Sequence, residues 1–305
     1  MRFSIWIGTE QPWPDVVAAA SHCAAEGWDG VYLADHFMPD GPSGPGRAGP
    51  RLEAWTAIAA LSSLVPRVRL GVLVSGNTYR HPAVLAKMAA TVDTLSDGRH
   101  VLGLGAGWQA SEHEAYGIPL GAPSERLDRL DEACQVIKSL FSKERTDFEG
   151  RYYRLKDAPC EPKPLQQPLP LLIGVSGERR AIALAARHAD EWNCWGLPDL
   201  IARKSAILDR ACEELGRDPS SVRRSAQALV MMSDDPAELR RSKQSPPPMP
   251  SAIGSPSELV EVMAAYEAAG VGEFVVSDRP LGETASERRD QMSRFFEEVA
   301  APLSS

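Results

Sequence analysis

Two adjacent polar residues, Asp35 and His36, directly follow a short apolar run at residues 30–34. A histidine beside a carboxylate can donate a hydrogen bond or a proton to a bound ring, which is acid–base chemistry. The alternative is a structural histidine whose ring hydrogen-bonds to neighbouring backbone. The position of His36 in the chain does not decide between these two interpretations.

Two glycine-containing turns could bring the backbone close to a flat ligand. The first, residues 74–77 (Val-Ser-Gly-Asn), ends an apolar run, and Gly and Asn tolerate unusual backbone dihedrals. The second has glycines at positions 103, 105 and 107 before Trp108, which would keep side chains out of the space above a strand. Either turn could also be an ordinary loop. The glycine spacing matches neither a dinucleotide-binding fingerprint nor a P-loop.

A third turn, formed by Ser176, Gly177, Glu178 and Arg179, opens a predicted helix over residues 177–188. Free backbone N–H groups at a helix N-terminus bind phosphate, and barrels of alternating strands and helices often place a phosphate site on such a loop. An ordinary serine or glycine N-cap is the alternative. Because Glu178 would repel an anion, we expect its side chain to point away.

The sequence disfavours several classes of site and partner. It has no GxSxG or HExxH motif and no metal-ligand spacing of His, Cys, Asp or Glu, which argues against hydrolases and metalloenzymes. A formal net charge of −8, without a basic cluster, argues against a nucleic-acid partner. No apolar run approaches the roughly 20 residues that span a membrane, and we find no signal-peptide pattern.

The chain has five cysteines, an odd number, at wide spacings and without a CxxC pair. This usage is typical of reduced thiols and predicts a cytoplasmic protein. Cys194 ends an apolar run, and we expect it to pack beside the core or a ligand rather than react.

Eight short β-rich runs alternate with helix-like stretches along the 305 residues. The runs are Phe3–Ile7, Gly30–Ala34, Val68–Val74, His100–Leu104, Pro170–Ile173, Glu191–Trp195, Arg224–Met231 and Gly272–Ser277. The helix-like stretches are Pro14–Glu26, Glu53–Leu64, Pro82–Leu95, Ser124–Phe141, Gly177–His188, Pro198–Leu215, Ser255–Ala269 and Ser286–Val299. Several runs are apolar on nearly every residue, which is typical of parallel strands covered on both faces.

This alternation predicts an α/β fold, a (β/α)8 TIM barrel formed by one domain over residues 1–305. An open doubly wound sheet is the alternative. Insertions are expected after strands 2, 4 and 7, with loops at 39–50 and 233–251 and a hairpin at 146–155. In such a barrel the residues that follow each strand line one rim, where the chemistry takes place, so the turns described above would meet there.

Six stretches together carry a resemblance to a known family. They are YLADHF (32–37), LVSGNTYRHPAVLAKMAATVDTLSDGR (73–99), VLGLGAGW (101–108), EHEAYGIP (112–119), ERLDRLDEACQVIKSL (125–140) and LLIGVSGERRAIALAARHADEWN (171–193). The chain resembles the bacterial luciferase-like oxidoreductase superfamily over nearly its whole length. GNTYRHPAVLAK is most similar to the branch that uses the deazaflavin F420, whereas the sister branch uses FMN and oxygen.

The resemblance implies a deazaflavin or flavin ring at the rim and a non-prolyl cis peptide bond near residues 73–75. It implies that Asp35 and His36 lie near the reactive edge of the ring. The remaining residues that it implies for cofactor binding are Val74, Ser75, Gly76, Asn77, Gly107 and Trp108 at the ring, and Ser176, Gly177 and Arg179 at the phosphate. It also implies a homodimer and a small-molecule substrate.

The sequence departs from the F420-dependent glucose-6-phosphate dehydrogenases of this superfamily. Asp40 and Trp108 stand where those enzymes have a tryptophan and a glutamate. Sugar-phosphate oxidation is therefore disfavoured, and His36 remains as the candidate proton donor. The expected activity is an F420-dependent oxidoreductase, with an FMN-dependent monooxygenase and a non-catalytic binding barrel as alternatives.

Overall fold

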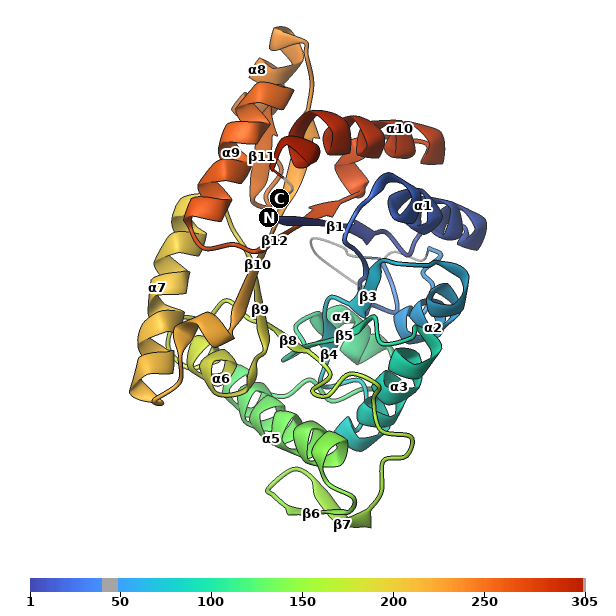
Figure 1. Cartoon of the computed structure of the whole chain (residues 1–305), viewed down its shortest axis with the longest axis vertical. Helices are drawn as coiled ribbons and strands as arrows, with labels where there is room; N and C mark the ends of the chain where they lie inside the picture. The colour runs from blue at the N-terminus through green and yellow to red at the C-terminus, as the bar shows by residue number, and fades with distance from the viewer. Residues whose placement is uncertain (40–48, 304–305) are drawn as a thin grey trace.

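Eight parallel strands close into a barrel in the computed structural model, which describes residues 1–39 and 49–303 (Figure 1). In barrel order they are β1 (Arg2–Ile7), β2 (Gly30–Leu33), β3 (Arg69–Val72), β5 (His100–Gly105), β8 (Leu171–Gly174), β9 (Glu191–Trp195), β10 (Arg223–Met232) and β12 (Glu273–Ser277). Parallel pairing of β12 with β1 completes the circle. The predicted (β/α)8 barrel is confirmed, and each of the eight predicted runs overlaps one of its strands.

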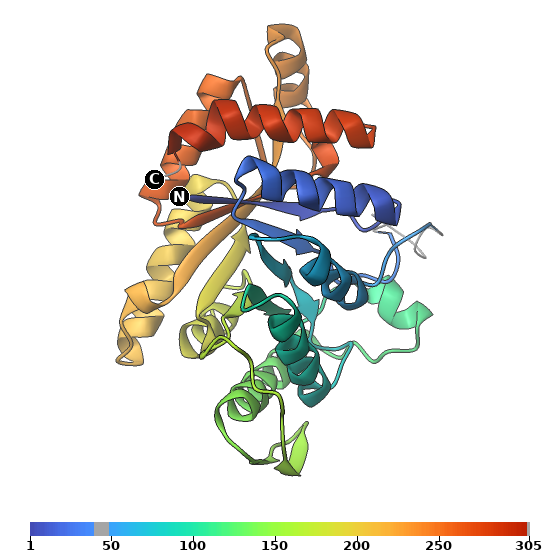
Figure 2. The same ribbon diagram turned by 45° about the vertical axis from the view of Figure 1, so that its right-hand side comes forward.

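Helices surround the barrel on the outside (Figure 2). They are α1 (Trp13–Glu26), α2 (Ala54–Leu64), α3 (Pro82–Leu95), α5 (Pro123–Ser142), α6 (Ala181–His188), α7 (Pro198–Glu214), α9 (Pro256–Ala268) and α10 (Ala285–Phe295). A capping box between Ser255 and Glu258 starts α9, as the sequence predicts. Within the described ranges, no helix is both long and apolar enough to cross a membrane.

The segments between the barrel units differ in part from the prediction. The hairpin is present as β6 (Thr146–Glu149) and β7 (Arg154–Ala158), and α4 (Ala110–Ala115) follows β5. The segment 233–251 is wrongly predicted as a loop throughout, because it contains α8 (Pro236–Gln244) and leads into β11 (Ser251–Gly254). Asp235 caps α8, and the prolines at 246–248 come only after this helix has ended. Of the predicted loop 39–50, residues 40–48 lie outside the described part of the chain.

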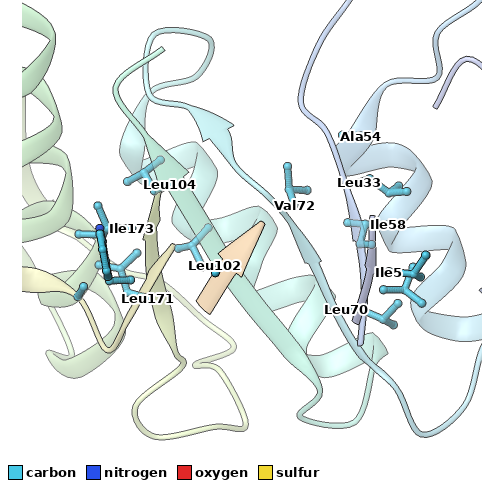
Figure 3. Packing of buried hydrophobic residues seen from close by; sticks show 14 of the residues in the cluster. Ile5, Leu33, Ala54, Ile58, Leu70, Val72, Leu102, Leu104, Leu171 and Ile173 are labelled. Carbon is cyan, nitrogen blue, oxygen red and sulfur yellow. The ribbon is translucent and has the colours of Figure 1, made fainter. Parts of the chain in front are cut away.

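Alternate residues of the strands fill two different cores. One set packs outward against the helices, as Ile5, Leu33, Leu70, Leu102 and Ile173 do in Figure 3. The other set points into the barrel and forms a smaller cluster. This inner cluster consists of Tyr32, Leu73, Val101, Leu172 and Val275, with Trp6 and Val74 packed against it. The five cysteines are buried and free, as the sequence predicts.

A buried ion cluster fills the N-terminal end of the barrel interior. Arg69 on β3 donates to Glu191 on β9 at 2.5 Å and to Glu273 on β12 at 2.9 Å. Both carboxylates are 1% exposed. Burial raises the pKa of Glu273, but Arg69 and Arg2 outweigh it and hold this pKa below its usual value. The cluster therefore joins three strands across the interior as paired charges.

Replacing Arg69 by methionine should lower the free energy of unfolding by about 1.5–3 kcal/mol, because it removes the shared partner of two buried carboxylates, each of which keeps one other arginine. Urea unfolding of both proteins measures the difference. Arg145→Met is the control: Arg145 pairs with Asp157 at 3.3 Å where both side chains are exposed. That pair should contribute less than about 1 kcal/mol. Equal effects of the two substitutions would contradict a structural role of the cluster.

Asp278 stands where β12 ends and faces the end of β1. Its carboxylate accepts hydrogen bonds from the Gly8 N–H at 3.0 Å and from Gln11 Nε2 at 2.6 Å. Burial raises the pKa of Asp278 to about 6. Because the pKa is higher in the folded chain than in the unfolded one, this group favours folding least when it is ionised.

The stability of the natural protein relative to Asp278→Asn should therefore fall as pH rises. The asparagine cannot titrate. Between pH 4 and pH 7 the free energy of unfolding of Asp278→Asn should therefore rise by about 2–3 kcal/mol relative to that of the natural protein. Urea unfolding of both proteins across this range provides the measurement. A difference that does not change with pH would show that Asp278 titrates at its ordinary value.

Candidate active site

Asp35 lies at the rim, two residues after the end of β2, and forms an ion pair with Arg80. Arg80 donates to its two oxygens at 2.6 Å and 3.1 Å, and Arg80 also donates to Glu53 at 2.5 Å. Burial raises the pKa of Asp35, and the opposing effect of Arg80 offsets it only in part. With both oxygens engaged, Asp35 joins β2 to the turn that precedes α3.

His36, the next residue, is held by a buried carboxylate. Its Nδ1 lies 2.7 Å from Oε1 of Glu112, and this oxygen also accepts the Tyr79 hydroxyl. The other carboxylate oxygen, Oε2, accepts the Phe37 N–H at 2.8 Å. Although burial raises the pKa of Glu112, the hydrogen bonds from His36 and Tyr79 lower it below its usual value. An ionised carboxylate only accepts, so Nδ1 carries a proton and Nε2 is the nitrogen left for a ligand.

Glu112 is the functional residue that the sequence analysis missed. The resemblance to the F420-dependent glucose-6-phosphate dehydrogenases places a glutamate at position 108, where this chain has Trp108. The carboxylate instead comes from Glu112 on α4, four residues later, so His36 does not lack an acidic partner. The signal was present, because Glu112 opens the family-like stretch 112–119, but only the fold shows that α4 brings it to His36.

The turn between β3 and α3 places Val74 over the inner cluster. The predicted non-prolyl cis peptide bond is present between Leu73 and Val74. A Cβ atom on Gly105 would lie 2.7 Å from Val74 Cγ2, and one on Gly174 would lie 2.8 Å from Val74 Cγ1. Gly105 and Gly174 therefore make room for Val74. The prediction that the glycines at 103, 105 and 107 keep side chains out of the space above the strand is wrong at Gly105, because Val74 fills that space.

The next residues of this turn differ in what they can offer a ligand. Ser75 is fully buried; its hydroxyl accepts from Trp55 Nε1 at 2.6 Å and also hydrogen-bonds to Asp35. Gly76 lies against the ring of Tyr79. Asn77 is 3% exposed and donates to the Tyr153 hydroxyl at 3.2 Å, while its Oδ1 has no partner among the described residues. Asn77 thus keeps an acceptor for a ligand.

The turn after β5 lies beside His36. Gly107 has a φ of +82°, which a side chain disfavours, and a Cβ there would also meet Thr78. Trp108 is 63% exposed, and its ring meets the His36 ring edge-on at 5.4 Å. Gln109 is buried, yet neither polar atom of its side chain has a partner in the described chain. Buried unpaired amides at Asn77 and Gln109 fit a flat ligand that carries both donors and acceptors.

The predicted phosphate turn after β8 is exposed and does not begin a helix. The prediction that a helix starts at Gly177 is wrong: α6 starts at Ala181, without a side-chain cap, after a turn at 178–180. Glu178 points away, as predicted, and pairs with Arg203 at 2.9 Å. Arg179 lines a cleft of about 650 Å³ between α5 and α6, with no carboxylate partner in the described ranges. Backbone N–H groups and this cation remain suitable for a phosphate.

The structure brings the predicted residues together along one arc of the rim. Asp35 and His36 follow β2, residues 74–77 follow β3, and residues 107–108 follow β5. Residues 176–179 follow β8, and these four strands are consecutive neighbours in the barrel. The arc thus runs from His36 after β2 to Arg179 after β8.

Relatives of the chain have both of the expected activities in their names. It is 34% identical over 222 residues to an F420-dependent glucose-6-phosphate dehydrogenase of Kineococcus radiotolerans, with 70% of this chain and 62% of that one covered. It is 31% identical over 198 residues to the pyrimidine monooxygenase RutA of Yersinia enterocolitica, with 63% and 52% covered. The chain therefore spans less than two thirds of the length of these curated relatives.

The fold and the family model agree with this result. An F420-dependent secondary alcohol dehydrogenase, solved in complex with an F420–acetone adduct, superposes with a TM-score of 0.82 at 18% identity, and 98% of each chain is covered. At that identity the likeness shows the shared fold alone. The model of the luciferase-like monooxygenase family matches residues 1–246. The chain therefore belongs to the luciferase-like monooxygenase family.

Proposed function

We propose that the chain is an F420-dependent oxidoreductase that transfers hydride between the deazaflavin and a small organic substrate. The observation that carries the proposal is His36, which Glu112 holds at the rim with one ring nitrogen left for a ligand. On the same rim, Oδ1 of Asn77 and both polar atoms of the Gln109 side chain are buried without a partner among the described residues, which suits a flat cofactor. The relative named as F420-dependent, aligned over 70% of this chain, supports the choice of cofactor.

Several groups of the rim would hold the cofactor. Val74 would support the ring from below, while Asn77 and the turn at 107–108 would border it. Ser176, Gly177 and Arg179 would bind its phosphate. Bound F420 supplies a ring carbon, C5, that gives or takes a hydride.

His36 would move the proton that accompanies hydride transfer. Because Glu112 fixes Nδ1 as a donor, Nε2 is the atom that takes up or releases a proton. The hydroxyl of Tyr79 donates to the same carboxylate, and burial raises the pKa of Tyr79, so it stays neutral. Glu112 is thus a positioning residue, and Asp35 holds Arg80 in the turn that precedes α3.

The tautomer of His36 tests this arrangement without a substrate. In the natural protein the neutral ring should carry its proton on Nδ1, whereas Glu112→Ala should move it to Nε2 because the acceptor is gone. Long-range ¹H–¹⁵N NMR spectra of the histidines at alkaline pH distinguish the two forms. The histidine His81, which accepts the Ala83 N–H at the start of α3, is the internal control and should not change.

Survival of the Nδ1–H form in Glu112→Ala would contradict the positioning role. Glu112→Gln is the second variant, because its amide oxygen still accepts from Nδ1. It should keep the Nδ1–H tautomer, which separates loss of the acceptor from general disruption of the site.

An FMN-dependent monooxygenase is the second candidate, because RutA relatives align over 63% of the chain. A non-catalytic binding barrel is the third, and it would leave the rim residues without a cofactor. The homodimer, the cytoplasmic location and the small-molecule substrate stay predictions.

Fluorescence titration of the purified protein with F420 and with FMN separates these candidates. F420 should bind at least about tenfold more tightly than FMN, a difference of about 1.4 kcal/mol. Arg179→Met should weaken F420 binding about fivefold, because a cation–phosphate contact is lost. Arg240→Met, an exposed arginine on α8, is the control and should leave it unchanged. FMN binding without F420 binding would favour the monooxygenase, and binding of neither would favour the non-catalytic barrel.

A further inference from the structure

Several buried hydrogen-bond donors at the barrel mouth have no partner in the described part of the chain. Two of them come from barrel strands: the indole Nε1 of Trp6 on β1 and the amide Nε2 of Gln227 on β10. Gln227 as a whole is 2% exposed. Buried donors in folded proteins are nearly always paired, so each of these two is suited to an acceptor on a ligand.

Both side chains point into the barrel near its C-terminal rim. Ile5 and Ile7 belong to the outer core, so Trp6 between them faces inward by the alternation of a strand. Ala226 and Ala228 place Gln227 inward in the same way. Trp6 is the last residue but one of β1, and it packs on the inner cluster beside Val74.

A second indole brings these two donors together. Trp195, the last residue of β9, is level with Gln227 in the parallel register. Its ring meets the Trp6 ring edge-on, with centroids 6.0 Å apart. Since β10 lies between β9 and β12, and β12 pairs with β1, the two indoles meet across the strands that separate them. Gln227 therefore lies next to Trp195, and Trp195 in turn contacts Trp6.

A lone unpaired indole would carry little weight, as Trp28 shows. Its Nε1 is also buried without a partner, but its ring packs between Phe295 and Phe296 in the outer core. Trp6 differs in two respects: it is only half-buried, and a second unpaired donor lies on the same interior face. Two unpaired donors that share the Trp195 ring as a neighbour suit a ligand with both an apolar ring and an acceptor.

We infer that Trp6 and Gln227 form a binding subsite for the carbonyl oxygen of an uncharged, flat substrate. Both donors are neutral, so a carbonyl suits them better than a carboxylate or a phosphate, each of which is bound best by a charged donor. The indoles of Trp6 and Trp195 supply an apolar surface for an aromatic or unsaturated ring. Two N–H donors on one oxygen also polarise a carbonyl group.

The inference rests on the proposed function, since it names the substrate class of the same site. A polarised, uncharged carbonyl compound is a suitable hydride acceptor. The subsite also agrees with the sequence-based expectation that a sugar phosphate is not the substrate. Trp6 and Gln227 are uncharged, so they would not balance the charge of a phosphate.

NMR spectra of the full-length protein with ¹⁵N-labelled indoles test the subsite, with and without F420. The chain has seven tryptophans, and Trp6→Phe assigns the signal of interest. Acetophenone is the probe, and α-methylstyrene, in which a CH₂ group replaces the oxygen, is its matched control. Acetophenone should move the Trp6 N–H signal to saturation, whereas α-methylstyrene should not move it.

Variants then measure the contribution of each donor. Trp6→Phe and Gln227→Met should each weaken acetophenone binding about five- to tenfold, which corresponds to one lost hydrogen bond. Trp28→Phe removes an equally buried and unpaired indole N–H from the outer core, and it should leave binding unchanged. Thermal melting curves confirm that each variant is folded.

Three results would overturn the subsite. The first is an equal response to α-methylstyrene, and the second is tighter binding of benzoate than of acetophenone. The third is a loss of F420 affinity in Trp6→Phe as large as the loss of acetophenone affinity, because the donors would then serve the cofactor. If acetophenone moves the Trp6 signal but F420 does not bind, the subsite stands and the proposed function fails.

Discussion

Backbone hydrogen bonds between β1 and β12 turn a sheet with two edges into a closed barrel, and the candidate site depends on this closure. In an open sheet the ends of β2 and β10 would lie far apart along a line. In the barrel, His36 after β2 and Gln227 on β10 face a common mouth. Closure also encloses a narrow interior that side chains must fill at every level, because a void there would cost contacts.

The interior changes character from one end to the other. Paired charges fill the N-terminal end, where Arg69 binds two carboxylates, and apolar side chains fill the middle. Val74 reaches in from the rim and occupies space that the glycines of β5 and β8 leave free. Val74 and the inner cluster together close the barrel interior below the rim, and a planar group could lie on this surface.

Much of the fold could be predicted from the sequence because its signals are local. Continuous apolar runs mark buried parallel strands, and the capping box at Ser255 marks a helix start within four residues. The start of α6 was misjudged because Ser176 looks like a cap, yet the chain makes a further turn before Ala181. The role of Glu112 could not be predicted, since it meets His36 across 76 positions of the chain. No local pattern records such a contact.

The strand β10 is longer than its barrel neighbours β9 and β12, and its C-terminal end pairs with a further strand, β11. Residues 223–228 pair with β9 and β12, while residues 229–232 pair with β11 instead. The last four residues therefore leave the barrel as a two-stranded ribbon above the mouth. Because residues 229–232 pair with β11 and with no barrel strand, the height of this ribbon is independent of the register that closes the barrel.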